Sequence, residues 1–136
     1  MSYREPLERP LERPLDRPLQ ARLAGMRRVV AAAGNSWRGL RACWRNEAAF
    51  RQEVVLAVPL LVVAAAWPVG KAERALMMAS VLLVLVVELL NSGIEAAIDR
   101  IGAAYHPLSG LAKDVGSAAV AVSMLLVVVV WACILA

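Results

Sequence analysis

Three long apolar segments dominate the second half of the chain, and each is bounded by polar or turn-forming residues. They cover residues 48–67, 75–98 and 115–136, and the last carries no charged side chain. About 20 apolar residues cross a bilayer as a helix, so the pattern predicts three membrane spans. The first segment is strongly apolar only from Val54, and its span must also recruit residues 48–50. Pro59 is a possible kink in this span.

The region before the spans, residues 25–46, shows helical periodicity with two distinct stripes. The apolar stripe comprises Val30, Ala33, Trp37, Leu40 and Trp44, and Arg38, Arg41 and Arg45 lie beside it. Tryptophans at headgroup depth and arginines near lipid phosphates are typical of an amphipathic surface helix in the membrane interface. A buried helix of a soluble domain is the alternative.

Residues 1–24 differ from the rest, because a proline recurs at every fourth position from Pro6 to Pro18. Such a repeat cannot continue as a helix, so we expect a disordered Pro-rich tail followed by a membrane domain over residues 25–136. A proline-motif ligand is the alternative function for the tail.

Composition narrows the class of protein. Of 136 residues, 60% are hydrophobic, against roughly 45 to 50% in soluble domains, and the mean hydropathy is +0.62. We therefore predict an all-α membrane protein. The net charge of +4 is concentrated in arginines before the first span, which places the N-terminus in the cytoplasm and, after three spans, the C-terminus outside. This distribution favours a membrane surface over nucleic acid. Cys43 and Cys133 lack the spacing of a disulfide framework or zinc site, which leaves them as packing residues.

The second span contains the candidate chemistry. Glu88, Asn91 and Glu95 are spaced i, i+3 and i+7, and Asp99 extends this row along one helix face. A carboxylate inside a spanning helix costs at least about 2.5 kcal/mol, so the face is expected to line a polar cavity with a cation or metal partner. The alternative is a hydrogen-bond network between packed helices.

Glu47 stands just before the first span, at the same predicted membrane level as Glu95. Magnesium usually takes one or two protein carboxylates and completes its shell with water and phosphate oxygens, so Glu47 and Glu95 could hold a magnesium–nucleotide complex. Equally, Glu47 could pair with Arg45 or Arg51. Lys113 and Asp114 end the expected polar link of residues 99–114, and Lys113 could bind phosphate there. Alternatively, both residues are charges at a helix start and have no function. P-loop, GxGxxG, HRD and GxSxG motifs are absent, which excludes the familiar soluble kinase folds.

Three runs of residues resemble the prokaryotic diacylglycerol kinases, small membrane enzymes unrelated to soluble kinases. They are GLRACWRNEAAFRQE at 39–53, VELLNSGIEAAIDRIG at 87–102 and YHPLSGLAKDVGSAAV at 105–120. The resemblance extends from about Arg28 to Cys133. It implies a homotrimer in the bacterial inner membrane, with active sites shared between subunits, that uses ATP and Mg²⁺ to phosphorylate 1,2-diacylglycerol to phosphatidic acid.

The resemblance also implies roles for individual residues. Glu88 corresponds to the general base, Asn91 to a residue that organises the cluster, and Glu47 and Glu95 to magnesium ligands. Positions that match the ATP site are Arg28, Asn35, Glu47, Glu95, Tyr105, His106, Lys113 and Asp114. Positions that match the lipid-substrate site are Arg28, Ser36, Trp37, Arg41, Trp44, Arg51, Gln52, Glu53, Glu88 and Ser117.

Three positions depart from the family pattern, namely Ala31, Asn35 and Leu111, where a lysine, an aromatic residue and an arginine are usual. The first two lie near the expected nucleotide site. Two other functions remain as alternatives: an undecaprenol kinase of the same fold, and a small proton-coupled exporter that uses an intramembrane glutamate. The exporter would explain Glu88 alone but not the whole polar group.

Overall fold

The structure is a computed structural model, and it describes residues 16–102, 104 and 106–136. Within these residues all regular structure is helical: α1 (Asp16–Asn46), α2 (Ala48–Ala66), α3 (Lys71–Ile101) and α4 (Pro107–Leu135). The chain divides into two compact units, one that ends at Arg38 and one formed by Gly39–Ala136. The second unit contains α2, α3, α4 and the last residues of α1.

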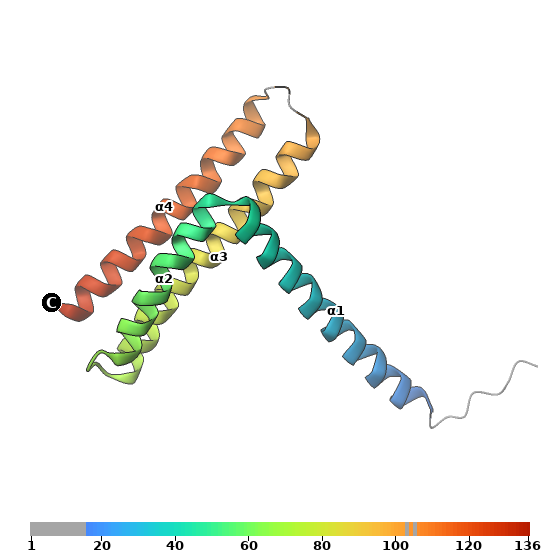
Figure 1. The fold of residues 1–136 in the computed structure, drawn as a ribbon, viewed down its shortest axis with the longest axis horizontal. Coiled ribbons are helices and arrows are strands. Elements are labelled where there is room, and N and C mark those ends of the chain that lie inside the picture. Colours follow the sequence, from blue (N-terminus) through green and yellow to red (C-terminus); the bar gives the residue numbers. More distant parts are fainter. Residues whose placement is uncertain (1–15, 103, 105) are drawn as a thin grey trace, which may run out of the picture. The chain divides into compact units, whose positions relative to one another are not determined.

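The three predicted spans are confirmed as helices long and apolar enough to cross a membrane, α2, α3 and α4. Both α2 and α4 pack on α3, and within the described chain they make no direct backbone approach to each other. Figure 1 shows the three helices side by side, with α2 along the first part of α3 and the start of α4 beside its last part. As a result, α3 is the central helix of this unit.

The buried residues of α3 form one stripe along the helix. Met77, Val81 and Val84 are followed at helical spacing by Glu88 and Asn91. Many buried positions on the neighbouring helices are small, namely Ala57 and Ala64 on α2 and Gly116 and Ser123 on α4, and larger side chains such as Phe50 and Val120 are buried beside them. Lipid removes most of the hydrophobic drive for helix association, so close packing through small residues is what holds such helices together.

The helix ends differ from the predicted boundaries. α1 begins at Asp16 rather than near residue 25, because Pro18 falls in its first turn, where no backbone N–H is needed. Residues 1–15, which carry most of the proline repeat, lie outside the described residues. α2 ends at Ala66, runs through Pro59 without interruption and has Trp67 as its C-cap.

The connection between α2 and α3 is shorter than the predicted turn, because α3 already begins at Lys71. Glu73 Oε2 accepts a hydrogen bond of 2.7 Å from Gly70 N, which satisfies a free donor at the helix start. Arg74 Nη2 donates to the carbonyl oxygens of Trp67 and Val69 at 3.0 and 3.5 Å. These bonds extend the helix by one turn beyond its apolar segment.

The polar link predicted for residues 99–114 is wrong in most of its length. α3 continues to Ile101, and α4 starts at Pro107 instead of residue 115. The N-cap residue of α4 is His106, whose Nδ1 accepts a hydrogen bond of 3.2 Å from Leu108 N, and Pro107 occupies the favoured first helical position. Lys113 and Asp114 therefore lie on a helix and not in a loop.

Candidate active site

The polar row of α3 lies on its buried face. Glu88 is 4% exposed, Asn91 is 8% exposed and the adjacent Ser92 is also buried, while Glu95 is half-buried. Their helical spacing continues the apolar stripe of Val81 and Val84. The predicted common face is thus confirmed, and it faces other helices of the protein.

Asn91 and Glu95 are directly linked. Asn91 Nδ2 donates a hydrogen bond of 3.1 Å to Glu95 Oε1, one helical turn away. Asn91 Oδ1 is buried, and no described residue donates a hydrogen bond to it. One side of the amide therefore orients the Glu95 carboxylate, and the other lies against the neighbouring helix.

Other carboxylates gather around Glu88. Glu95 and Glu47 act electrostatically on Glu88, and Glu88 in turn acts on Glu53 from α2. Glu47 is the N-cap residue of α2, yet its side chain makes no capping hydrogen bond. Glu53 is 7% exposed, and its Oε2 has no hydrogen-bond partner among the described residues. The first turns of α2 and the middle of α3 thus bring four acids into one neighbourhood.

A cation lies at the α4 side of this acid cluster, which we define as Glu47, Glu53, Glu88 and Glu95. Lys113 Nζ forms an ion pair with Asp99 Oδ1 at 2.5 Å, which joins the start of α4 to the end of α3. Lys113 also interacts electrostatically with Glu95. The ammonium group stays partly accessible, with 39% of its side chain exposed, so it can reach an anion near the cluster.

The junction between α1 and α2 is held by Arg51. Its Nη1 donates to the carbonyl oxygens of Trp44 and Arg45, at 3.1 and 3.2 Å. These carbonyls lie in the last turn of α1, where backbone acceptors lack helical partners. Of the two arginines proposed as alternatives for Glu47, neither Arg45 nor Arg51 forms an ion pair with it in the described structure. The Glu47 carboxylate is therefore not paired with either neighbouring arginine.

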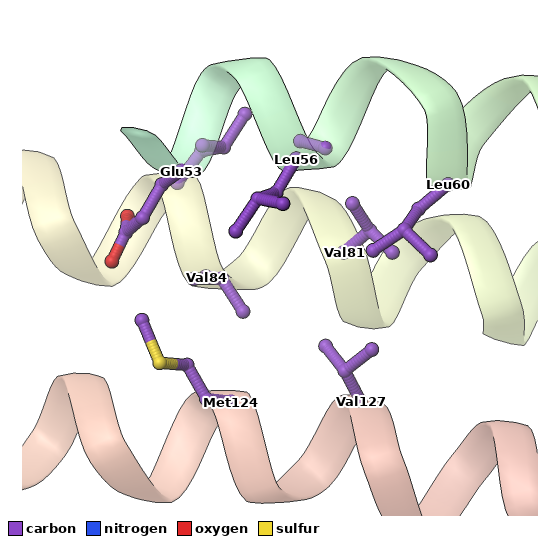
Figure 2. Close-up of a pocket in the computed structure, with 9 residues that line it drawn as sticks. Glu53, Leu56, Leu60, Val81, Val84, Met124 and Val127 are labelled. Carbon is purple, nitrogen blue, oxygen red and sulfur yellow. The ribbon is translucent and has the colours of Figure 1, made fainter. Parts of the chain in front are cut away.

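An apolar groove of about 150 Å³ extends from Glu53 between the three helices. Figure 2 shows its walls, made of side chains from α2, α3 and α4, with the Glu53 carboxylate at one end. The labelled lining residues are Glu53, Leu56, Leu60, Val81, Val84, Met124 and Val127. A carboxylate at the end of an apolar groove combines a polar anchor with a surface suited to hydrocarbon.

The remaining predicted residues are described separately within each of the two units. In the unit that ends at Arg38, Arg28 and Trp37 are exposed, Arg38 Nη2 donates to Asn35 Oδ1, and Ser36 Oγ donates to the Ala32 carbonyl oxygen at 3.1 Å. In the second unit, side chains exposed to the surroundings are those of Arg41, Trp44, Gln52, His106, Asp114 and Ser117. Tyr105 lies outside the described residues.

The donor set of the cluster suits a hard divalent cation in part. Carboxylate oxygens are the ligands that Mg²⁺ prefers, and two of them suffice when phosphate oxygens and water complete its shell. Across residues 16–102, 104 and 106–136, no three His, Cys, Asp or Glu side chains are close enough to hold a metal by themselves. The acids fit a metal that arrives with a phosphate ligand rather than a closed protein cage.

Two features of this region could not be recognised from the sequence. The ion pair between Asp99 and Lys113 depends on α4 starting early, and its only sequence signal is opposite charge at the facing ends of two helices. Gly116 lies on α4 directly against Asn91. A glycine in an apolar helix is a weak signal, because the register between the helices must be known before its neighbour can be named.

Comparison with known proteins finds the same family description at every match reported below. A family described as "Prokaryotic diacylglycerol kinase" matches residues 34–135. A protein named "Diacylglycerol kinase" from Escherichia coli (strain K12) is 58% identical over 112 residues, which are 82% of this chain and 90% of the relative. Another of that name, from Pseudomonas aeruginosa, is 52% identical over 82% of this chain and 90% of its own length. A Helicobacter pylori relative of that name is 38% identical over 79% and 84%, respectively.

Proposed function

The chain belongs to the prokaryotic diacylglycerol kinase family, its activity is the phosphorylation of diacylglycerol, and we propose that the acid cluster performs it. In this proposal Glu88 is the general base. Glu47 and Glu95 hold Mg²⁺ with the phosphates of ATP, and Asn91 orients Glu95. The observation that carries the proposal is the burial of Glu88 together with the electrostatic influence of Glu95 and Glu47 on its carboxyl group.

The position of Glu88 supports its role as the base. Its carboxylate is shielded at the centre of α3, where the hydroxyl of a membrane lipid can approach but bulk water is restricted. As the lipid hydroxyl oxygen attacks the γ-phosphorus, Glu88 accepts the hydroxyl proton, the bond to the bridging oxygen breaks and ADP leaves. The product is phosphatidic acid. Most of the acceleration in such transfers comes from positioning and charge neutralisation, so one well-placed base suffices.

Glu47 and Glu95 are the proposed magnesium ligands because both are partly accessible and neither is engaged in an ion pair in the described structure. When bound, Mg²⁺ would neutralise charge on the ATP phosphates. Lys113 binds a phosphate oxygen as a point charge. The other proposed nucleotide contacts are Arg28, Asn35, Tyr105, His106 and Asp114.

The lipid is proposed to lie with its glycerol end at Glu53 and Glu88. The apolar groove that begins at Glu53 supports this orientation, since an acyl chain can follow it between the helices. Arg51 supports the site indirectly by fastening the end of α1. The other proposed lipid contacts are Arg28, Ser36, Trp37, Arg41, Trp44, Gln52 and Ser117.

Three apolar helices and a prokaryotic membrane-enzyme family fit a bacterial inner membrane protein. We propose a cytoplasmic N-terminus, with α1 as an amphipathic surface helix, and an external C-terminus, because the arginines precede α2. A homotrimer with shared sites is also proposed, because the resemblance to the family implies it. The family assignment removes the exporter alternative, and nothing observed favours undecaprenol as the acceptor.

The test is transfer of labelled γ-phosphate from magnesium–ATP to diacylglycerol and, in parallel, to undecaprenol, by detergent-solubilised protein. Glu88→Gln should lower kcat at least about 100-fold, the usual loss when a positioned base is removed. The matched control is Glu73→Gln near the opposite end of the same helix, where the amide oxygen can still accept from Gly70 N. A Glu88→Gln protein with near-normal kcat would overturn the role as base. Faster transfer to undecaprenol would change the acceptor.

A further inference from the structure

Gly116 on α4 lies so close to Asn91 of α3 that a side chain at residue 116 would have no room. A Cβ atom built on Gly116 would collide with Asn91 Oδ1 and lie 3.2 Å from Asn91 Cγ and 3.9 Å from Asn91 Cβ. Both residues are buried. The absence of a Cβ at this one position therefore lets the Asn91 amide occupy the space between α3 and α4.

The position of that amide determines its hydrogen bond. The amide group is planar, so Oδ1 cannot move away from a new methyl group without moving Nδ2 as well. Nδ2 donates the 3.1 Å bond to Glu95 Oε1. Exchanging the two amide ends does not help, because Nδ2 would then occupy the crowded place and the acceptor would face a carboxylate. A side chain at residue 116 thus displaces the Asn91 amide from the position in which it donates to Glu95.

On this basis we propose that Gly116 is a positioning residue of the kinase, which acts through Asn91 to hold the Glu95 carboxylate in the orientation that receives Mg²⁺. The inference rests on the proposed function, in which Glu95 is a magnesium ligand. Residues that orient metal ligands typically affect metal affinity 10- to 100-fold. Gly116 would exert this effect without contacting metal, nucleotide or lipid.

A purely structural role for Gly116 predicts a different result. In a helix interior, replacing glycine with alanine removes backbone freedom from the unfolded chain and favours the helix. Helix propensity would raise the stability of Gly116→Ala slightly and the clash at the packed interface would lower it, but neither effect changes the Mg²⁺ requirement of the folded protein. The positioning role predicts weaker use of Mg²⁺ by a protein that is still folded.

The experiment measures the free Mg²⁺ concentration that gives half-maximal transfer to diacylglycerol, together with thermal stability in detergent. Gly116→Ala should raise this concentration about 10-fold. The matched control is Gly93→Ala on α3, two residues from Asn91, where an added Cβ meets no atom within 4 Å. Its Mg²⁺ requirement should equal that of the wild type, and an equal rise in both variants would overturn the proposal.

A double-mutant cycle with Asn91→Ala tests whether the effect passes through the amide. Once the amide is gone, Gly116→Ala should add no further rise in the Mg²⁺ requirement. A full additional rise in the double variant contradicts the proposal. So does a Gly116→Ala protein that fails to fold while the double variant folds, because the contact would then serve packing.

Glu95→Gln, measured alongside, separates the two proposals. An unchanged Mg²⁺ requirement in Glu95→Gln overturns the assignment of Glu95 as a metal ligand, and with it the basis of the inference. A raised requirement in Glu95→Gln with a normal one in Gly116→Ala overturns the positioning role alone.

Discussion

Both halves of α3 carry a buried stripe, but its side chains are mainly apolar in the first half and polar in the second. In the first half, Met77 and Val81 are 0% and 3% exposed and pack against small residues of α2. In the second half, Glu88 and Asn91 are 4% and 8% exposed on the same stripe. A helix that needed only to be held in the membrane would repeat the first half. In the proposed function, the second half retains its polar groups for the reaction.

The distribution of buried polar atoms without partners supports this division. Of five such atoms in the described structure, Glu53 Oε2, Asn91 Oδ1 and Ser92 Oγ lie on or beside the polar half, whereas Arg74 Nε lies at the start of α3 and Trp131 Nε1 on α4. A buried acceptor or donor without a partner typically costs 1–3 kcal/mol. Substitutions in the first half should reduce stability and leave the reaction rate unchanged. Substitutions in the second half should slow the reaction and change stability little.

The largest effect on stability is expected for Met77→Ala. Met77 is the largest fully buried side chain among the described residues, so its truncation leaves a cavity beside α3. We expect a loss of about 2 kcal/mol, the low end for buried methionine, because lipid weakens the hydrophobic part of the loss. Denaturation in mixed detergent micelles measures it. The kcat of the folded fraction should remain normal, and a drop in kcat would show that the two halves are not separable.

Asn91→Ala should have the opposite signature. It removes the hydrogen bond to Glu95, so the rate at limiting Mg²⁺ should fall about 10-fold. Stability should change by less than about 1 kcal/mol, as is usual for polar contacts between membrane helices. The same denaturation and transfer assays apply. A stability loss as large as that of Met77→Ala, with normal Mg²⁺ dependence, would make Asn91 a packing residue.

The smallest effect is expected at the Asp99–Lys113 ion pair. Both partners are well exposed, and such pairs contribute little to stability. Asp99→Asn should leave the thermal midpoint nearly unchanged and alter the KM for magnesium–ATP by no more than about twofold. Lys113→Gln should raise that KM several-fold, because the proposed phosphate contact is lost. Steady-state kinetics at saturating diacylglycerol measure both. Equal changes in the two variants would assign Lys113 to the ion pair only.

The sequence was sufficient for the three spans and for the polar face, because both depend on local periodicity. Glu88, Asn91 and Glu95 share a helix face wherever the helix is placed. Helix boundaries were less accessible. Hydropathy detects where a helix can cross a membrane and not where its hydrogen bonds end, so the first turns of α4, with Ser109, Lys113 and Asp114, resembled a loop.

Contacts between helices could not be predicted from the sequence, because a local pattern carries no information on how two helices pack. The family resemblance placed Glu53 among lipid contacts, but its proximity to Glu88 depends on how α2 lies on α3. The same is true of Gly116, whose importance depends on the one residue that faces it. The roles proposed for the site residues remain predictions.

The central position of α3 also bears on biosynthesis. Helices emerge from the ribosome in the order α2, α3, α4, so α3 reaches the membrane before the helix that carries Lys113 and Gly116. During that interval Asn91 and Glu95 lack the neighbour that covers them, although carboxylates in a spanning helix are costly when exposed to lipid. The arrival of α4 therefore covers the polar face of α3 and ends its exposure to lipid in a single step of assembly.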